Sequence, residues 1–216
     1  MKRLRAVLAL LFALPLAGQK PFRPPPLAPP KAPLKVYHLG HSLVGKDMPY
    51  MLAQLAGRGH RWNSQLGWGT TLKAHWEPGE EIAGFEENTA PTYRDAREAI
   101  GSGEYDAVVL TEMVELRAAI RYYDSARYLR RWADLARESS EDTTVYLYET
   151  WHRLDDPDGW LERIARDLDS LWLGGVLGKD TQRNPERPVY LIPGGQVLAA
   201  VARSAEAGEL EGLSSR

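Results

Sequence analysis

The fold of this chain is decided by the stretch VYHLGHSL, residues 36–43, which runs on into VGKD, residues 44–47. Its first four residues are strand formers that end at Gly40, and a helical pattern opens at Asp47. Open α/β sheets place their chemistry at the carboxyl end of such a strand. Gly40 leaves room for a substrate, and Ser42 is a candidate nucleophile. An ordinary turn or capping role for Ser42 is the alternative.

Predicted strands and helices alternate along the rest of the chain. We predict strands at residues 36–39, 60–66, 105–110, 144–148 and 189–192, and helices that begin at Asp47, Thr92, Asp124, Asp158 and Gln196. The segment 105–110 is almost entirely apolar, as expected of a strand in the middle of a parallel sheet. This alternation predicts an α/β fold, a three-layer αβα sandwich around a mainly parallel, five-stranded sheet.

The helix that opens at Asp47 carries its apolar residues on one side. Met48, Met51, Leu52 and Leu55 follow helical spacing. A helix with one apolar side is typical of the outer layers of a sandwich. We therefore expect this side to pack on the sheet.

The long segment at residues 72–91 shows no clear period, and loops of this length are often functional. Trp76 and Phe85 form either a lid over a pocket or the small core of a surface excursion. His75 in the same segment is either exposed or within reach of a substrate.

Four polar segments follow predicted strands, and the carboxyl ends of parallel strands share one edge of a sheet. These segments are Ser42, the loop 67–71, Thr111–Glu112 and Trp151–His152. The aromatic rings among them form either a platform for a sugar or acyl group, or the packing of loops on the sheet. The chain has no metal-ligand spacing and no phosphate-binding glycine loop, so we predict no metal and no cofactor.

The composition is that of a soluble globular protein. The 216 residues are 44% hydrophobic and 26% charged, and the formal net charge is −2. Such a charge does not attract nucleic acid or anionic lipid, and the arginines alternate with acidic residues as on solvated, salt-bridged surfaces. The chain has no cysteine, which excludes disulfides, thiolate metal sites and cysteine nucleophiles.

Residues 1–18 have the layout of a secretory signal peptide. A basic start that ends at Arg5 precedes a short apolar core, residues 6–14, and small residues follow at 15–18. The apolar run is short for a membrane span, although an uncleaved anchor is the alternative. We therefore expect an exported protein, periplasmic or secreted, with no integral membrane domain after cleavage.

The next segment, residues 19–33, is rich in proline, which favours an extended polyproline conformation. We interpret it as a semi-rigid linker, with a ligand for a partner as the alternative. The folded domain is expected at residues 34–216.

The sequence GHSL at residues 40–43 resembles the first block of the SGNH, or GDSL-type, hydrolase superfamily, with His41 in place of the block's aspartate. Gly69 is similar to the glycine of the second block, and Gly67 is the other candidate. The resemblance implies a flavodoxin-like three-layer fold, Ser42 as the nucleophile, and an N–H of Gly69 in the oxyanion hole. With the segments 67–71 and 148–152 included, the chain looks like a little-characterised bacterial branch of the superfamily.

The third block of the superfamily supplies an asparagine after the third strand, where this chain has Thr111-Glu112. An ionised glutamate repels an oxyanion. The third donor is therefore absent, or Thr111 supplies it, or Glu112 is protonated by burial or has another task such as orienting a histidine.

The superfamily's base histidine, with an aspartate three residues before it, follows the last strand, but no histidine follows His152 here. A serine hydroxyl without a base is a poor nucleophile. We expect the domain at residues 34–216 to be truncated at its carboxyl end. The alternative is that His152 or His41 takes the role of base with a different geometry.

The resemblance thus implies a serine hydrolase, an esterase that cleaves an ester or O-acyl group of a small molecule or glycan through an acyl-enzyme. The predicted catalytic residues are Ser42 and His152, and the predicted oxyanion or substrate-binding residues are His41, Gly67, Trp68, Gly69, Thr111 and Glu112. The alternative is a catalytically incomplete exported protein of the same fold that binds a glycan or peptide. Ser42 reacts with an active-site probe only in the first case.

Overall fold

The structure is a computed structural model that describes residues 23–24, 26–30, 32–210 and 212. The predicted signal peptide, residues 1–18, lies outside the described residues. In the predicted linker, Pro24, Pro26, Pro29 and Pro30 line one pocket with Tyr146 and Tyr190 of the sheet. Arg23 forms an ion pair with Asp169.

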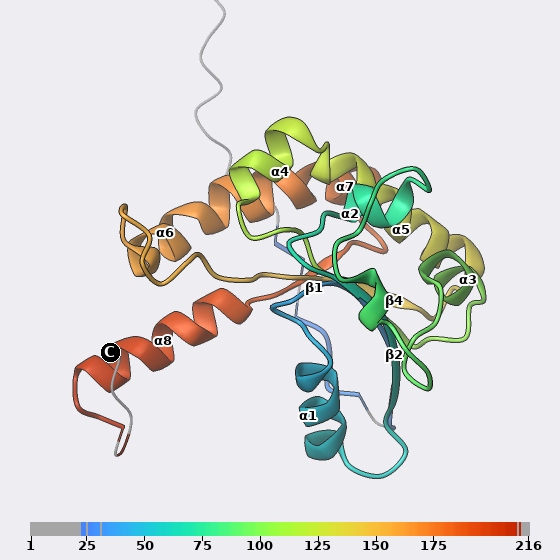
Figure 1. The fold of residues 1–216 in the computed structure, drawn as a ribbon, viewed down its shortest axis with the longest axis horizontal. Helices are drawn as coiled ribbons and strands as arrows, with labels where there is room; N and C mark the ends of the chain where they lie inside the picture. The colour runs from blue at the N-terminus through green and yellow to red at the C-terminus, as the bar shows by residue number, and fades with distance from the viewer. Residues whose placement is uncertain (1–22, 25, 31, 211, 213–216) are drawn as a thin grey trace, which may run out of the picture.

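The described chain is built on one five-stranded parallel sheet (Figure 1). Its strands are β1 (Lys35–His41), β2 (Arg61–Gly67), β3 (Ala107–Leu110), β4 (Thr144–Tyr148) and β5 (Tyr190–Ile192), arranged in the order β2-β1-β3-β4-β5. The predicted α/β class and parallel five-stranded sheet are confirmed. The direction of winding reverses between β1 and β3, and open α/β sheets bind ligands outside the carboxyl ends of the strands at such a point.

Helices lie on both faces of the sheet, as in a three-layer sandwich (Figure 1). They are α1 (Asp47–Ala56), α2 (Leu72–Trp76), α3 (Ala96–Gly101), α4 (Leu116–Tyr122), α5 (Ser125–Ser139), α6 (Trp160–Asp167), α7 (Gly178–Arg183) and α8 (Gly194–Glu206), with a 3-10 turn η1 (Phe85–Glu87) and a π-helical segment η2 (Leu168–Leu177). The sequence pattern does not predict α2, α4 or α7, because helices this short contain too few residues for a clear period.

One face of the sheet carries the main hydrophobic core. Tyr37 and Leu39 of β1 point into it, and α5 covers them with Leu129 and Trp132, all of them fully buried. Every residue of β3 is buried, because the strand is covered on both faces, and this explains why it reads as a continuous apolar run. This core fixes the position of α5 and, through it, of α2 above the carboxyl edge.

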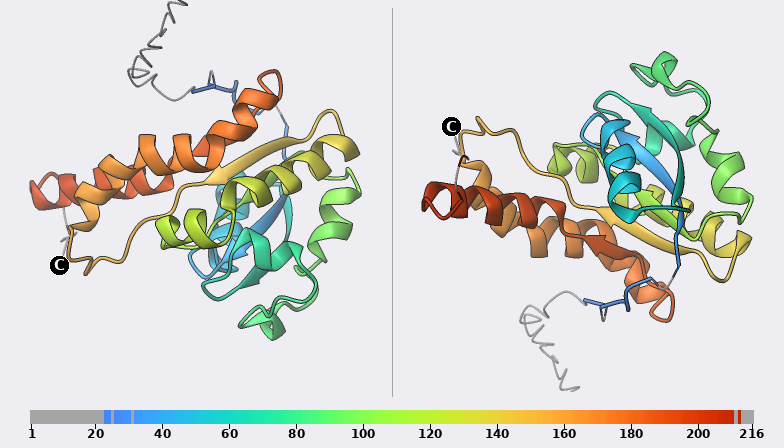
Figure 2. Two further views of the ribbon diagram at one scale, coloured as in Figure 1. Left: turned by 90° about the horizontal axis from the view of Figure 1, so that it is seen from above. Right: turned by 90° about the horizontal axis from the view of Figure 1, so that it is seen from below.

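The opposite face of the sheet is covered less completely. In the described residues its buried hydrophobic cluster is Val36, Ala107 and Val109, with Tyr146 and Ile192 partly buried around them, and His38 is buried beside Val36. α1 lies below this face, and α8 extends away from the sheet beside α6 (Figures 1 and 2). Burial of this face is therefore incomplete in the described residues.

The apolar side of α1 does not pack on the sheet as the sequence predicts. Leu55 is 85% exposed, Met51 is 59% exposed and Leu52 is 39% exposed. The buried residue of this helix is Pro49, which anchors its first turn. The helical period was thus correct, but the burial inferred from it was wrong.

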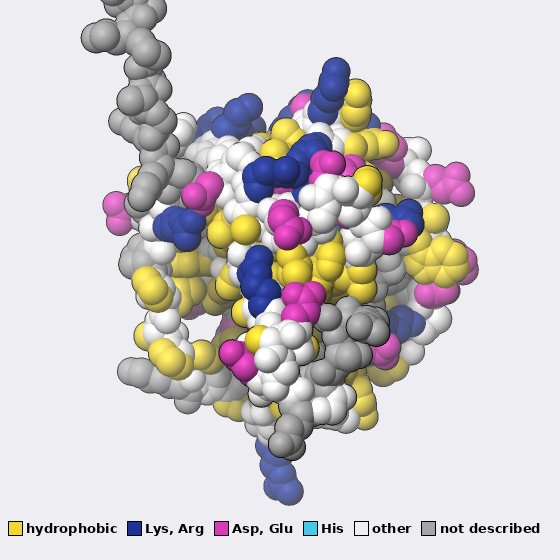
Figure 3. Space-filling model, turned by 90° about the vertical axis from the view of Figure 1, so that its left-hand side faces the viewer, with side chains coloured by type: hydrophobic (Ala, Val, Ile, Leu, Met, Phe, Trp, Pro, Cys, Tyr) yellow, Lys and Arg dark blue, Asp and Glu magenta, His cyan; other side chains and the backbone are white. Residues whose placement is uncertain are grey.

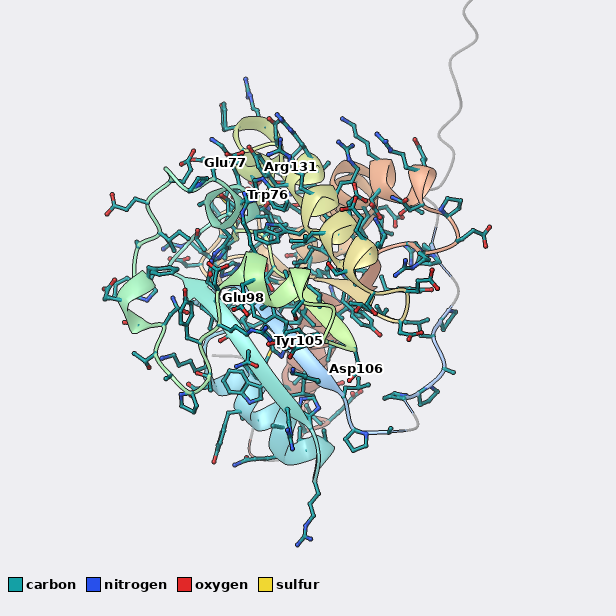
Figure 4. The ribbon with its side chains drawn as sticks, turned by 90° about the vertical axis from the view of Figure 1, so that its right-hand side faces the viewer. Trp76, Glu77, Glu98, Tyr105, Asp106 and Arg131 are labelled. Atoms are coloured by element: carbon teal, nitrogen blue, oxygen red, sulfur yellow. The ribbon has the colours of Figure 1, made fainter. Side chains whose placement is uncertain are left out.

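Trp76 does not form a lid. Its ring packs edge-on against Trp132, with ring centroids 4.7 Å apart, and joins the main core. Figure 4 shows Trp76, Glu77 and Arg131 together where α2 meets α5, and Arg131 Nη1 donates to Glu77 Oε1 at 3.0 Å. Residues 72–77 therefore belong to the main body of the domain.

Charged side chains of both signs are intermixed on the surface seen in Figure 3, which views the molecule from the side of α6 and α8. Hydrophobic side chains lie among them. In the described part of the chain, no helix combines the length and the apolar character that crossing a bilayer requires.

A buried ion pair joins α5 to α7. Arg137 donates from Nη1 to Asp180 Oδ1 at 2.8 Å and from Nη2 to Asp180 Oδ2 at 2.7 Å, and Asp180 is fully buried. Removing one partner of such a pair leaves an uncompensated buried charge. This pair holds the helices after β4 against the long helix of the main core.

We predict that Asp180→Ala lowers the free energy of unfolding by about 3 kcal/mol, because Arg137 then loses its buried partner and keeps only the partly exposed Asp134 as an acidic partner. The matched control is Asp155→Ala, which breaks the exposed pair between Arg153 and Asp155 and should leave the free energy of unfolding nearly unchanged. Urea denaturation of both variants measures the difference, and equal losses would contradict the assigned role of the buried pair.

Candidate functional site

Ser42 lies on a tight turn directly after β1. The carbonyl oxygen of His41 accepts hydrogen bonds from the N–H groups of Val44 at 2.9 Å and Gly45 at 3.2 Å. Gly45 has a φ of 55°, a left-handed conformation that favours glycine. The turn leaves the Ser42 side chain exposed at the carboxyl edge of the sheet, while Val44 is buried beneath it.

A cleft of about 500 Å³ opens beside Ser42. Gly67 and Trp68, which follow β2, form the opposite wall, and Lys46 and Asn88 also line it. The volume is in the range of small-molecule sites. The structure thus brings Ser42 together with Gly67, one of the two candidates for the second-block glycine, and with Trp68.

Asn88 was not found by the sequence analysis, and it shapes this cleft. Its Nδ2 donates to the carbonyl of Leu66 at 2.7 Å, and its Oδ1 accepts from the N–H of Leu66 at 2.9 Å. The side chain thereby pairs with the free edge of β2 as a neighbouring strand would. No local pattern signals this role, because the pairing depends on how residues 77–88 return to the sheet.

The side chain of Trp68 is 56% exposed and forms the wall of the cleft. Its indole N–H donates to Glu87 Oε2 at 3.3 Å, and a Cβ on Gly84 would lie 2.6 Å from its Nε1, so the ring rests closely on that glycine. Its backbone N–H donates to the carbonyl of Ala83 at 2.7 Å. A half-exposed indole held at both ends is suited to stacking against a ligand.

Gly67 and Gly69 differ in their surroundings. A Cβ on Gly67 would lie 2.3 Å from Ile82 Cγ2, so glycine is needed for the loop to pack on the end of β2. Gly69 lies two residues farther along the loop and has a φ of 55°. It is exposed and does not line the cleft. Which of the two supplies an oxyanion donor stays a prediction.

Gly40 permits close packing rather than substrate entry. A Cβ at this position would lie 2.7 Å from Thr111 Cβ and 3.0 Å from Thr111 Oγ1. The space that the sequence analysis assigned to a substrate is filled by Thr111, which follows β3 and is itself buried. Thr111 therefore does not line the Ser42 cleft and fills the gap between β1 and β3 instead.

His41 is fully buried and structural in its contacts. Its Nδ1 accepts the N–H of Leu43 at 3.3 Å, so its Nε2 carries the proton and donates to the carbonyl of Glu112 at 2.9 Å. Burial lowers the pKa of His41, which favours this neutral form. Both ring nitrogens are thus engaged away from the Ser42 cleft.

His75 is buried below the same edge, contrary to the expectation of an exposed or substrate-facing loop residue. Its Nε2 donates to the carbonyl of Gly40 at 2.9 Å, and its Nδ1 accepts from Gln65 Nε2 at 3.0 Å. Gln65 Oε1 accepts from the N–H of Ala96 at 3.0 Å. Burial lowers the pKa of His75 to about 4, so its ring is neutral. A chain of hydrogen bonds through His75 and Gln65 thus links the end of β1 to α3.

Glu112 is fully buried after β3. Its Oε1 accepts from the N–H groups of Met113 at 2.9 Å and Leu72 at 3.3 Å, while Oε2 and the nearby Ser125 hydroxyl have no hydrogen-bond partner of acceptable geometry in the described residues. Burial raises the pKa of Glu112 to about 7. The carboxyl group accepts the first N–H of α2, that of Leu72, and does not line the Ser42 cleft.

His152 lies in a separate charged cluster after β4. Its Nε2 is 3.4 Å from Asp167 Oδ2, and Arg163 Nε is 3.3 Å from the same oxygen, all three residues being buried. Burial and the Arg163 guanidinium lower the pKa of His152. β3 lies between β1 and β4, which separates the strand ends by about 10 Å.

No histidine lines the Ser42 cleft within the described residues. Nor do three metal-ligating His, Asp or Glu side chains gather anywhere in the part of the chain that the structure describes. The candidate site is thus a hydroxyl on a turn, in a cleft that Gly67, an indole and an asparagine also line. The side chains predicted after β3 and β4 lie elsewhere.

No family model matches this chain, and neither a curated protein nor a solved structure is significantly similar to it.

We predict that Gly40→Ala lowers the free energy of unfolding by about 1–3 kcal/mol, because the added methyl group overpacks the contact with Thr111. Gly79→Ala is the control, since a Cβ there meets open space. Chemical denaturation compares the two. A Gly40→Ala protein as stable as the control would show that β1 and β3 are not held this closely.

We predict that Glu112→Gln removes a pH dependence of stability. Because the native pKa is about 7 and the usual value is 4.5, the native state keeps this proton after the unfolded chain has lost it. The stability of the unmodified protein therefore falls as the pH rises through this window. The variant should gain roughly 2–3 kcal/mol relative to the unmodified protein between pH 5 and pH 8.

Urea denaturation at both pH values measures this gain. Glu138→Gln, at an exposed position on α5, is the control and should change stability by less than about 0.5 kcal/mol at either pH. A constant difference between Glu112→Gln and the unmodified protein across the pH range would contradict the buried, protonated carboxyl group.

Proposed function

We propose that this protein is an acyl hydrolase of the SGNH type, with Ser42 as its nucleophile and the flavodoxin-like fold of that superfamily. The observation that carries the proposal is the exposed Ser42 hydroxyl on a turn after β1, where it faces Gly67 and Trp68 across a cleft. This is the edge of a parallel sheet at which open α/β proteins bind ligands. The resemblance of residues 40–43 to the superfamily's first block points the same way.

In the proposed reaction, Ser42 Oγ attacks the carbonyl carbon of an ester. A bond forms between Oγ and that carbon, the bond to the leaving alcohol oxygen breaks, and the hydroxyl proton passes to the alcohol. Water then attacks the acyl-enzyme, releases the carboxylic acid and restores the hydroxyl. N–H groups of Ser42 and Gly69 are the proposed oxyanion donors, and such donors contribute roughly 3–4 kcal/mol each in other enzymes.

The reaction also needs a base that accepts the proton of the Ser42 hydroxyl. Asp47 and Lys46 line the cleft with Ser42, and the Lys46 ammonium is bound to the carbonyl of Glu87. His41 has both ring nitrogens engaged, and His152 is paired with Asp167. With no histidine in the described cleft lining, turnover is expected to be slow.

A second function is favoured by that same observation. A protein with this cleft and no base is suited to binding, and Trp68 would supply the stacking surface for a glycan or peptide. In both cases we propose an exported, periplasmic or secreted protein, on the basis of residues 1–18.

We predict that a fluorophosphonate probe modifies Ser42 and that peptide mass spectrometry finds the adduct on the peptide containing it. Ser42→Ala should abolish labelling, while Ser170→Ala, at an exposed serine on η2, should label as the unmodified protein does. Absence of any Ser42 adduct after prolonged incubation would reject the hydrolase and leave the binding protein.

A further inference from the structure

Ser42 lies at the junction of two clefts. One is the cleft lined by Trp68 and Asn88, and the other, of about 510 Å³, runs along α1. Ser42, Gly45 and Asp47 line both. A carbonyl carbon at the Ser42 hydroxyl would therefore have one substituent in each cleft.

The two clefts differ in chemistry. The first is lined by polar and charged side chains, those of Glu87, Lys46 and Asn88, beside the Trp68 indole. The walls of the second are aliphatic and come from Leu43, Val44, Met48, Met51, Leu52 and Leu55. A substrate that spans both clefts thus has a polar part and a hydrocarbon part.

The apolar wall is long and open to solvent. Met48, Met51, Leu52 and Leu55 form one stripe on α1, and the axial distance from Asp47 to Leu55 is about 12 Å, close to the length of about ten carbon–carbon bonds in an extended chain. This stripe does not pack on the sheet, since Leu55 is 85% exposed. In the described part of the chain, its apolar surface is therefore open to a ligand that begins at Ser42.

We propose that the cleft along α1 binds the acyl chain of the ester that Ser42 attacks, and that the Trp68 cleft holds the leaving alcohol. This inference rests on the proposed hydrolase function and names its substrate class, an ester of a medium- to long-chain carboxylic acid with a polar alcohol. Hydrocarbon fits the α1 cleft because its walls offer only aliphatic groups beyond Asp47. A polar alcohol fits the Trp68 cleft because charged and amide side chains, those of Lys46, Glu87 and Asn88, line it.

The test compares two fluorophosphonates, one with an ethyl and one with a dodecyl group on phosphorus, because that group occupies the acyl position. We expect Ser42 to react about 30-fold faster with the dodecyl probe, since each methylene that leaves water adds favourable transfer free energy. In the double variant Leu52→Gln, Leu55→Gln, the ratio of the two rate constants should fall below about fivefold. Glutamine retains helix propensity at these exposed positions, so α1 should still form.

The matched control is Val201→Gln, a polar substitution of an exposed aliphatic residue on α8, which should keep the ratio of the unmodified protein. Equal rates for the two probes on Ser42 would overturn the acyl cleft while the hydrolase proposal stands. Failure of both probes to label Ser42 would reject the hydrolase itself. A dimer in sedimentation experiments that dissociates in the double variant, together with equal probe rates, would assign the stripe to a second copy of the chain.

Discussion

The close approach of β1 and β3 at their carboxyl ends is the constraint on which the rest of this structure depends. Gly40 lies against Thr111 with no space for a side chain between them. One residue later, His41 Nε2 donates to the carbonyl of Glu112 and ties the two strand ends together. The turn that carries Ser42 begins at the same histidine, so the direction of the candidate nucleophile follows from this contact.

The groups beneath the site edge are polar but neutral. Burial favours the uncharged forms of His41, His75 and Glu112, and each of them binds backbone groups rather than a ligand. A charge in this layer would be costly, because none of these three groups forms an ion pair in the described part of the chain. These three side chains therefore hold the strand ends and the start of α2 in place. The exposed turn that carries Ser42 is the part of this edge that can contact a ligand.

The two faces of the sheet are covered unequally, and this inequality gives the molecule its exposed apolar surface. α5 and its neighbours cover one face with a continuous core. On the other face, α1 is anchored by Pro49 near its start, while α8 extends beside α6. Apolar side chains that would be buried in a fully covered sandwich thus lie in the open, and those of α1 lie next to Ser42.

Four features could be predicted from the sequence: the α/β class, the parallel sheet, the position of every strand to within two residues, and the turn that carries Ser42. These features depend on local patterns, such as the apolar run ending at Tyr148 and the glycines around Ser42, and local patterns are visible along the chain. Burial, pairing and partner choice were decided only by the tertiary structure. The sequence could not show that Leu55 is exposed, that His75 is buried, or that Asn88 pairs with the edge of β2. Each of these outcomes depends on which distant segment packs against the residue, and that packing is a property of the whole fold.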